Sequence, residues 1–254
     1  MPPLAQDLRA AANSVIFPTW TALCVSAGIC AGAVTRDSDL FYRWQRHWAR
    51  GPFVLCGIPL HVSGQQNMEP DRGYVVIANH SSYMDIPAVF ASLPTLPSFF
   101  AKRELSRIPF LGQALRSGRH ILVDRGSRSS ARDTLERAAA HVRRGGSVLI
   151  FPEGTRQTRD AIGTFKSGAF RLAKLAQAPI LPVGIRGTRH VLPKHGRLLR
   201  SHPVQLQIGA PISRTEVLDI DLGSLTRLCR AKVAELAGLP IEEATGESGE
   251  TATG

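Results

Sequence analysis

From Gly51 onward, short apolar runs alternate with longer segments in which apolar residues recur at helical spacing. In the segment Ser130–Arg144 the apolar residues fall on one helical face, and two glycines follow its end. The expected strands are short apolar runs bounded by glycine, proline or polar residues, namely Tyr74–Ala78, Ser98–Ala101, His120–Val123, Ser147–Phe151, Ile180–Ile185 and Val204–Ile208. The expected helices of this region are Ile86–Ser92, Leu111–Ser117, Ser130–Arg144, Ala169–Gln177 and Leu222–Ala237. This alternation predicts an α/β fold with a central, mostly parallel or mixed sheet flanked by helices.

The first 50 residues have a different character. No charged residue occurs from Ala10 to Thr35, and Val15–Val34 is about as long as a segment that spans a bilayer. Pro18 and several Gly, Ser and Thr residues interrupt this stretch, so a clean span does not follow from it. A signal peptide is an alternative, because Ala31–Ala33 resembles a cleavage site, although Asp7 offsets the one upstream arginine.

The segment Asp37–Arg50 combines aromatic and basic residues. Its apolar residues recur at helical spacing and include Trp44 and Trp48, with three arginines interleaved. Tryptophan and arginine beside an apolar segment suit the membrane–water interface, whereas an ordinary amphipathic helix on a core is the plain alternative. We therefore expect residues 1–50 to form a membrane-associating helical pair, shallow or partly embedded. The arginines after the apolar stretch favour a location of the following domain on the cytoplasmic side.

Composition narrows the function classes open to this 254-residue chain. Hydrophobic residues make up 43%, which excludes disorder throughout. The formal net charge is +11, and Arg36–Arg200 carries 26 basic against 11 acidic residues. Such a surface attracts nucleic acid, anionic membranes or phosphorylated substrates, unless it serves only solubility. Aromatic residues are 6%, and all three tryptophans lie in the first 48 residues, which argues against a nucleic-acid-binding protein.

A histidine and an aspartate follow the expected strand Tyr74–Ala78. His80 and Asp85 are five residues apart and can meet across one turn. A carboxylate that accepts a hydrogen bond from one ring nitrogen fixes the tautomer and leaves the other nitrogen as a base. Two simpler interpretations exist: Asp85 is the N-cap of the next helix, and His80 is a turn residue bonded to backbone.

Other common catalytic signatures are missing from the sequence. Ser81 and Ser82 are possible nucleophiles, but the chain has no G-x-S-x-G motif, no Walker loop and no G-x-G-x-x-G. The four cysteines form no CxxC pair and have no histidine partner at zinc spacing. Neither a disulfide scaffold nor a metal site is therefore expected.

Basic residues follow three further expected strands. Lys102, Arg125 and Arg156 each lie just beyond a strand end. Ligands of open α/β sheets gather beyond the carboxyl ends of the strands, and converging cations there suit a phosphate group. The alternative is three unrelated surface cations in an arginine-rich protein.

Together these blocks resemble the 1-acylglycerol-3-phosphate acyltransferase family of glycerolipid acyltransferases. The resemblance covers about residues 40–210, and a polar tail from 240 to 254 has no counterpart in it. The matching blocks are N-H-x4-D at Asn79, His80 and Asp85, K-x-E-L at Lys102 to Leu105 followed by Pro109 and Gly112, Val123-Asp124-Arg125, F-P-E-G-T-R at Phe151 to Arg156 with Phe165 to Gly168, and Ile180 to Val183.

The resemblance implies a glycerolipid acyltransferase-like α/β domain over residues 51–239. The polar tail, 240–254, is expected to lack stable structure. The resemblance assigns His80 as general base on the acceptor hydroxyl and Asp85 as the residue that orients it. It also implies that Lys102, Arg125 and Arg156 bind the acceptor phosphate. Glu153 and Gly154 would bind the glycerol portion of the acceptor.

The implied substrates are lysophosphatidic acid, or a related lysophospholipid, and an acyl thioester of coenzyme A or acyl-carrier protein. No metal or further cofactor is implied. Relatives with similar blocks acylate glycerol 3-phosphate or other lyso-lipids, so the acceptor stays open. A non-catalytic membrane scaffold is a further alternative, against which the intact His80, Asp85, Arg125 and Glu153 argue.

Overall fold

The structure, a computed structural model, describes residues 3–35, 38–107, 112, 115, 120–123 and 128–242. Within these residues seven strands form one sheet. The strands are β1 (Leu60–Ser63), β2 (Val75–Ala78), β3 (Ser98–Lys102), β4 (Ile121–Val123), β5 (Val148–Ile150), β6 (Ile180–Arg186) and β7 (Val204–Ile208). Their order across the sheet is β1-β7-β6-β2-β5-β3-β4. Neighbours are parallel except β6 and β7, so the predicted mixed α/β sheet is confirmed.

Helices cover both faces of this sheet. The helices are α1 (Pro3–Thr35), α2 (Ser38–Leu55), α3 (Asp85–Ser92), α5 (Arg128–Arg143), α6 (Gly168–Ala176), α7 (Thr188–Val191), α8 (Arg214–Asp219) and α9 (Leu222–Ala237), with 3-10 turns η1 (Gln65–Asn67) and η2 (Arg103–Arg107). Successive side chains of a strand point to opposite faces, and β2 illustrates this. Val75 and Ile77 pack with α5, α6 and α9, whereas Val76 and Ala78 pack with α2 and α3.

Most expected elements are present with small shifts. Every predicted strand is found to within one residue at either end, and the helix predicted over Leu222–Ala237 has those bounds. The sequence pattern does not predict the edge strand β1 or the short helices α7 and α8. The predicted helix Leu111–Ser117 lies largely outside the described residues.

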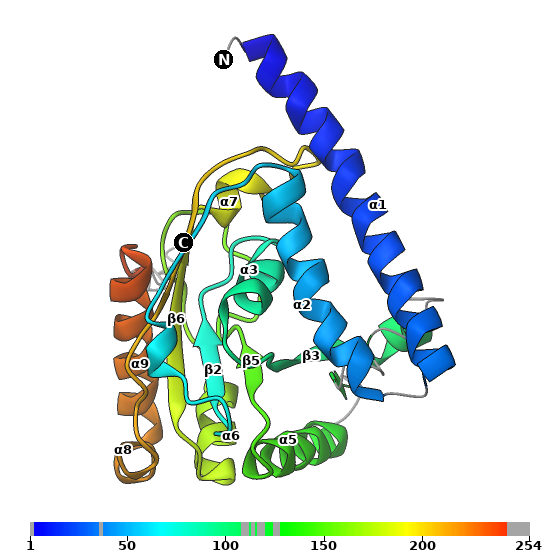
Figure 1. Ribbon diagram of the computed structural model, residues 1–254. Helices are drawn as coiled ribbons and strands as arrows, with labels where there is room; N and C mark the ends of the chain where they lie inside the picture. Colours follow the sequence, from blue (N-terminus) through cyan, green and yellow to red (C-terminus); the bar gives the residue numbers. More distant parts are fainter. Residues whose placement is uncertain are drawn as a thin grey trace, which may run out of the picture.

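The N-terminal region forms two helices packed side by side (Figure 1). Helix α1 continues through Pro18, although this proline predicts an interruption of the apolar stretch. The Trp20 indole N–H donates to the Trp48 carbonyl at 3.0 Å, and the Trp48 indole N–H donates to the Thr21 hydroxyl at 3.1 Å. Helix α2 extends past the expected domain boundary at residue 50, and Phe53 enters the core.

The other end of the domain is held by a short bridge. Ile241 pairs with Ile162, and the Arg230 guanidinium donates to the Glu242 carbonyl at 2.6 Å. Residues 243–254, the rest of the predicted tail, lie outside the described residues.

A buried asparagine joins two central strands where they end. Asn79 directly follows β2 and is 3% exposed. Its Oδ1 accepts from the Ile185 N–H and its Nδ2 donates to the Ile185 carbonyl, both at 2.8 Å. This pair of bonds fixes the chain leaving β2 against β6 and sets the position of the next residue, His80.

We expect Asn79→Ala to lower the free energy of unfolding by about 2–4 kcal/mol, because it leaves a buried N–H and C=O of Ile185 without partners. Urea denaturation of the purified protein measures this change. Gln207→Ala, at an exposed position of β7, is the control and should cost less than about 0.5 kcal/mol. Equal stabilities of the two variants would contradict the role given to Asn79.

Candidate active site

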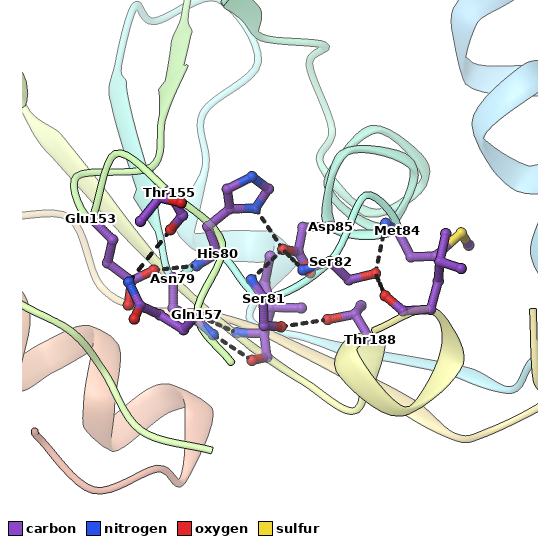
Figure 2. A network of polar contacts seen from close by, with 12 residues as sticks. Asn79, His80, Ser81, Ser82, Met84, Asp85, Glu153, Thr155, Gln157 and Thr188 are labelled. Carbon is purple, nitrogen blue, oxygen red and sulfur yellow. Dashed lines mark hydrogen bonds and ion pairs between the residues drawn. The ribbon is translucent and has the colours of Figure 1, made fainter. Parts of the chain in front are cut away.

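His80 and Asp85 meet at the carboxyl end of β2, as their spacing predicts (Figure 2). The His80 Nδ1 and Asp85 Oδ2 atoms are 2.7 Å apart. The same Oδ2 accepts the backbone N–H of Ser81 at 2.8 Å and of Ser82 at 2.9 Å. Because a carboxylate only accepts, Nδ1 carries the proton of the neutral ring, and Nε2 is left with a free lone pair.

Asp85 is not the N-cap of helix α3. It occupies the first turn of α3, and the capping position belongs to Met84. The Asp85 side chain is 0% exposed, and its second oxygen, Oδ1, has no hydrogen-bond partner in the described part of the chain. The whole carboxylate is therefore enclosed by the protein beside the His80 ring.

The imidazole of His80 is held on its other sides as well. It stacks on Phe151 with ring centroids 4.0 Å apart and planes 14° apart. The His80 carbonyl accepts the Gln157 N–H at 2.7 Å, and the His80 side chain is 16% exposed. The ring is therefore fixed in place while it stays accessible from one side.

Glu153 lies beneath the His80 loop. Its side chain is 4% exposed, with Oε2 accepting the His80 N–H at 2.7 Å and Oε1 accepting the Gly163 N–H at 2.9 Å. Burial raises the pKa of Glu153 to about 7, although the two N–H donors act to lower it. Its contact with the glycerol portion of a substrate stays a prediction, because both oxygens already have backbone partners.

The structure describes one of the three predicted phosphate-binding side chains. Lys102 ends strand β3, and Arg125 lies outside the described residues. The guanidinium carbon of Arg156 lies 3.7 Å from the centre of the Tyr83 ring, and Arg156 Nη1 is buried without a hydrogen-bond partner among the described residues. A buried donor of this kind suits an anion that is not part of the protein.

Gly154 has a backbone conformation that explains its residue type. Its φ is +73°, in the left-handed region, and a Cβ at this position would lie 3.0 Å from Lys166 Nζ. A larger residue would therefore strain the turn that carries Arg156. The predicted contact of Gly154 with substrate stays a prediction.

An apolar cavity of about 270 Å³ adjoins the His80–Asp85 loop. Helices α1, α2 and α3 line it together with Tyr83, Phe99 and His120. Burial lowers the pKa of His120 to about 3, and its Nδ1 accepts the Phe99 N–H at 3.4 Å, so this histidine is neutral. The cavity is thus uncharged and suits a hydrocarbon chain.

Three contributors to this site were missed by the sequence analysis. The ring of Phe151, the backbone N–H of Gln157 and the side chain of Tyr83 all contact residues that it identified. Phe151 and Gln157 lie in or next to the F-P-E-G-T-R block, and Tyr83 lies inside N-H-x4-D, so the blocks themselves were the available signal. Among the described residues, no group of three His, Cys, Asp or Glu side chains could hold a metal ion.

The sequence profile of the Acyltransferase family matches residues 59–186, which include the whole His80–Asp85 loop and Glu153. The chain belongs to this family. Acyltransferase-family relatives include the 1-acyl-sn-glycerol-3-phosphate acyltransferase of Saccharomyces cerevisiae, which is 31% identical over 72% of this chain and 61% of its own length. The 1-acyl-sn-glycerol-3-phosphate acyltransferase alpha of Homo sapiens is 31% identical over 67% and 61%.

The chain thus spans about three fifths of the yeast and human relatives. It spans 44% of a chloroplastic relative from Brassica napus. The fold is shared with the crystal structure of the 1-acyl-sn-glycerophosphate (LPA) acyltransferase PlsC of Thermotoga maritima, with a TM-score of 0.81, 24% identity and coverage of 92% and 96% of the two chains.

The raised pKa of Glu153 predicts a pH-dependent stability of this acyltransferase-family protein. Native Glu153 binds its proton more tightly than the unfolded chain does, with a pKa of about 7 against 4.5. Protonated Glu153 therefore adds to the free energy of unfolding at low pH. This contribution, at most about 3 kcal/mol, is lost as the pH rises from about 4.5 through 7.

Urea unfolding of the wild type and of Glu153→Gln between pH 4.5 and 7.5 measures this loss. The free energy of unfolding of the wild type should fall relative to that of Glu153→Gln as the pH rises. Glu235→Gln, at an exposed position of α9, is the matched control and should run parallel to the wild type. A constant difference between wild type and Glu153→Gln would show that burial does not raise the pKa of Glu153.

Proposed function

We propose that the protein transfers a fatty acyl group from an acyl thioester to the sn-2 hydroxyl of 1-acyl-sn-glycerol 3-phosphate, giving phosphatidic acid. The observation that carries this proposal is a histidine oriented by a buried carboxylate beside an apolar cavity and a cation. Family membership and the names of the relatives support the reaction class and the acceptor.

His80 is the general base in the proposed reaction. As the acceptor hydroxyl oxygen attacks the thioester carbonyl carbon, its proton moves to His80 Nε2, and Asp85 stabilises the resulting imidazolium. The tetrahedral intermediate collapses when the C–S bond breaks, and the leaving thiolate takes the proton from His80. An ester and a thiol are formed, and His80 returns to its neutral state.

A covalent acyl-enzyme is not needed, because a thioester is already an activated acyl donor. The Ser81 hydroxyl is within 3.1 Å of the Thr188 hydroxyl, and the Ser82 hydroxyl donates to the Leu192 carbonyl, so both have structural partners. No metal or further cofactor enters the proposed step. The acyl donor is the thioester of coenzyme A or of acyl-carrier protein.

The acceptor binds with its phosphate at the strand ends and its acyl chain in apolar surroundings. Arg156 donates to the phosphate, together with Lys102 and Arg125 in the manner that the resemblance implies. The apolar cavity between α1, α2 and α3 takes an acyl chain and excludes the water that would hydrolyse the thioester.

The N-terminal helices bring this site to the membrane. The stretch Leu4–Ala31 of α1 is long and apolar enough to cross a bilayer, and its Leu8, Val15 and Leu23 are exposed. Polar contacts tie the same helix to the body, however, since the Asn13 amide and Arg9 guanidinium donate to the Cys56 carbonyl. This favours an α1 that lies in the interface over one that spans the bilayer, with the catalytic domain on the cytoplasmic side.

His80→Ala should lower kcat for acyl transfer by about 10²–10⁴-fold while leaving the fold intact, because the base is lost. Asp85→Asn should also be severely impaired, because an amide fixes neither tautomer nor imidazolium. The assay is thiol release together with phosphatidic acid formation by the purified protein. His190→Ala, an exposed histidine of α7, is the matched control and should retain activity. Near-normal turnover by His80→Ala would overturn the mechanism.

The acceptor is tested with the wild type. A panel of lysophosphatidic acid, glycerol 3-phosphate and other lysophospholipids should rank lysophosphatidic acid first at equal concentration. A higher kcat/KM for glycerol 3-phosphate or for a zwitterionic lysophospholipid would move the proposed acceptor to that compound.

The membrane proposal predicts that the protein floats with vesicles at low and at high salt, because apolar insertion is not screened. The triple change of Leu8, Val15 and Leu23 to Glu should abolish flotation. Leu218→Glu, which replaces an exposed leucine of α8 instead, should leave it unchanged. Wild-type protein that stays at the bottom with both anionic and neutral vesicles would refute membrane association.

A further inference from the structure

Tyr83 lies between the two halves of the proposed acceptor site. It belongs to the loop between His80 and Asp85, lines the apolar cavity, and has the Arg156 guanidinium over its ring at 3.7 Å. Resting on the proposed function, we propose that Tyr83 is a positioning residue that holds Arg156 for the acceptor phosphate and separates this phosphate from the acyl-chain cavity.

Arg156 depends on Tyr83 because the rest of the described protein offers its guanidinium no other anchor. Within the described ranges Arg156 has no ion pair and no side-chain hydrogen bond, and its Nη1 is buried without a partner. It is carried by a turn that includes Gly154 at a φ of +73°. A long side chain on such a turn would otherwise sample many rotamers, and binding would have to order it.

An aromatic face is a suitable anchor for an arginine that must bind phosphate. The five N–H donors of a guanidinium lie in its plane, whereas a stacked ring contacts it from above or below that plane. Stacking on Tyr83 therefore orients the plane and leaves the donors for a bidentate contact with phosphate. A carboxylate partner would occupy the same donors and would compete with the substrate.

The contrast with nearby Arg189 supports this argument. The guanidinium of Arg189 forms an ion pair with Asp160 through two nitrogen atoms, so its donors are occupied. Both arginines come from elements that border the His80 loop, and of the two only Arg156 has side-chain donors without a partner in the described part of the chain. The adjacent Gln157 N–H bonds to the His80 carbonyl, which keeps Arg156 close to the general base.

Tyr83 also connects the phosphate site to the cavity. Tyr83 as a whole residue is 59% exposed. It nevertheless lines the cavity together with Ile86, Pro87 and Phe90 of α3. An acceptor with its phosphate on Arg156 and its acyl chain in the cavity would therefore pass over Tyr83. Tyr83 thus lies where the anionic group and the hydrocarbon chain of one bound acceptor would meet.

The test compares Tyr83→Leu, which keeps an apolar lining but removes the aromatic face, with Tyr83→Phe, which keeps the ring. Tyr83→Leu should raise KM for lysophosphatidic acid about 2- to 30-fold, the range of a lost cation–π contact, with little change in kcat. Tyr83→Phe should match the wild type. With a monoacylglycerol acceptor, which has no phosphate, Tyr83→Leu and Tyr83→Phe should not differ from each other.

A double-mutant cycle identifies the partner of Tyr83. Once Arg156→Gln has removed the cation, adding Tyr83→Leu should raise KM for lysophosphatidic acid no further. Arg159→Gln is the matched control: Arg159 lies in the same loop and pairs with Glu242, so Tyr83→Leu should keep its full effect in that background. Calorimetric titration with a short-chain lysophosphatidic acid measures the same cycle as Kd, independently of turnover.

The outcomes separate this inference from the proposed function. An unchanged KM and Kd in Tyr83→Leu, or equal effects with and without Arg156, would overturn the positioning role of Tyr83. A loss with Tyr83→Phe as large as with Tyr83→Leu would also overturn it, because the ring would not be the cause. Wild-type protein that binds lysophosphatidic acid through this coupled pair but transfers no acyl group would support the inference and refute the proposed function.

Discussion

The carboxylate of Asp85 accepts three hydrogen bonds through one oxygen, from the His80 ring and from the backbone of Ser81 and Ser82. The loop after β2 is wrapped around this oxygen, and its position is set by α3, whose first turn contains Asp85 and whose Phe90 lies in the core. The orientation of the proposed base therefore depends on the packing of a helix and not on loop contacts alone.

The strands on both sides of β2 also hold the loop that carries His80. Strand β2 lies between β6 and β5, so Asn79 is bonded to the end of β6 while His80 is bonded to Glu153 beyond β5. Parallel strands deliver these groups to one edge of the sheet, where ligands of α/β proteins gather. At this edge Tyr83 both lines the apolar cavity and contacts the Arg156 guanidinium. A molecule with an anionic head and a hydrocarbon tail fits that combination.

The fold was predictable where local pattern sufficed. Buried strands such as β2 and the capped helix α9 follow from apolar runs and periodicity, and the His80–Asp85 contact follows from a spacing of one turn. Strand β1 was not predictable, because its four residues form a strand by pairing with β7, which is distant in the sequence. The buried position of Glu153 and the stacking of Arg156 on Tyr83 also depend on which strands are neighbours, and no spacing in the sequence encodes that.

The most direct test of this account is the tautomer of His80, observed by ¹⁵N NMR of histidine-labelled protein, with the resonance assigned by comparison with His80→Gln. If Asp85 orients His80 as the base, neutral His80 carries its proton on Nδ1 and Nε2 is unprotonated, and this preference is lost in Asp85→Asn. If the single proton of neutral wild-type His80 were on Nε2, His80 could not be the base, because the nitrogen that faces the substrate would already be protonated.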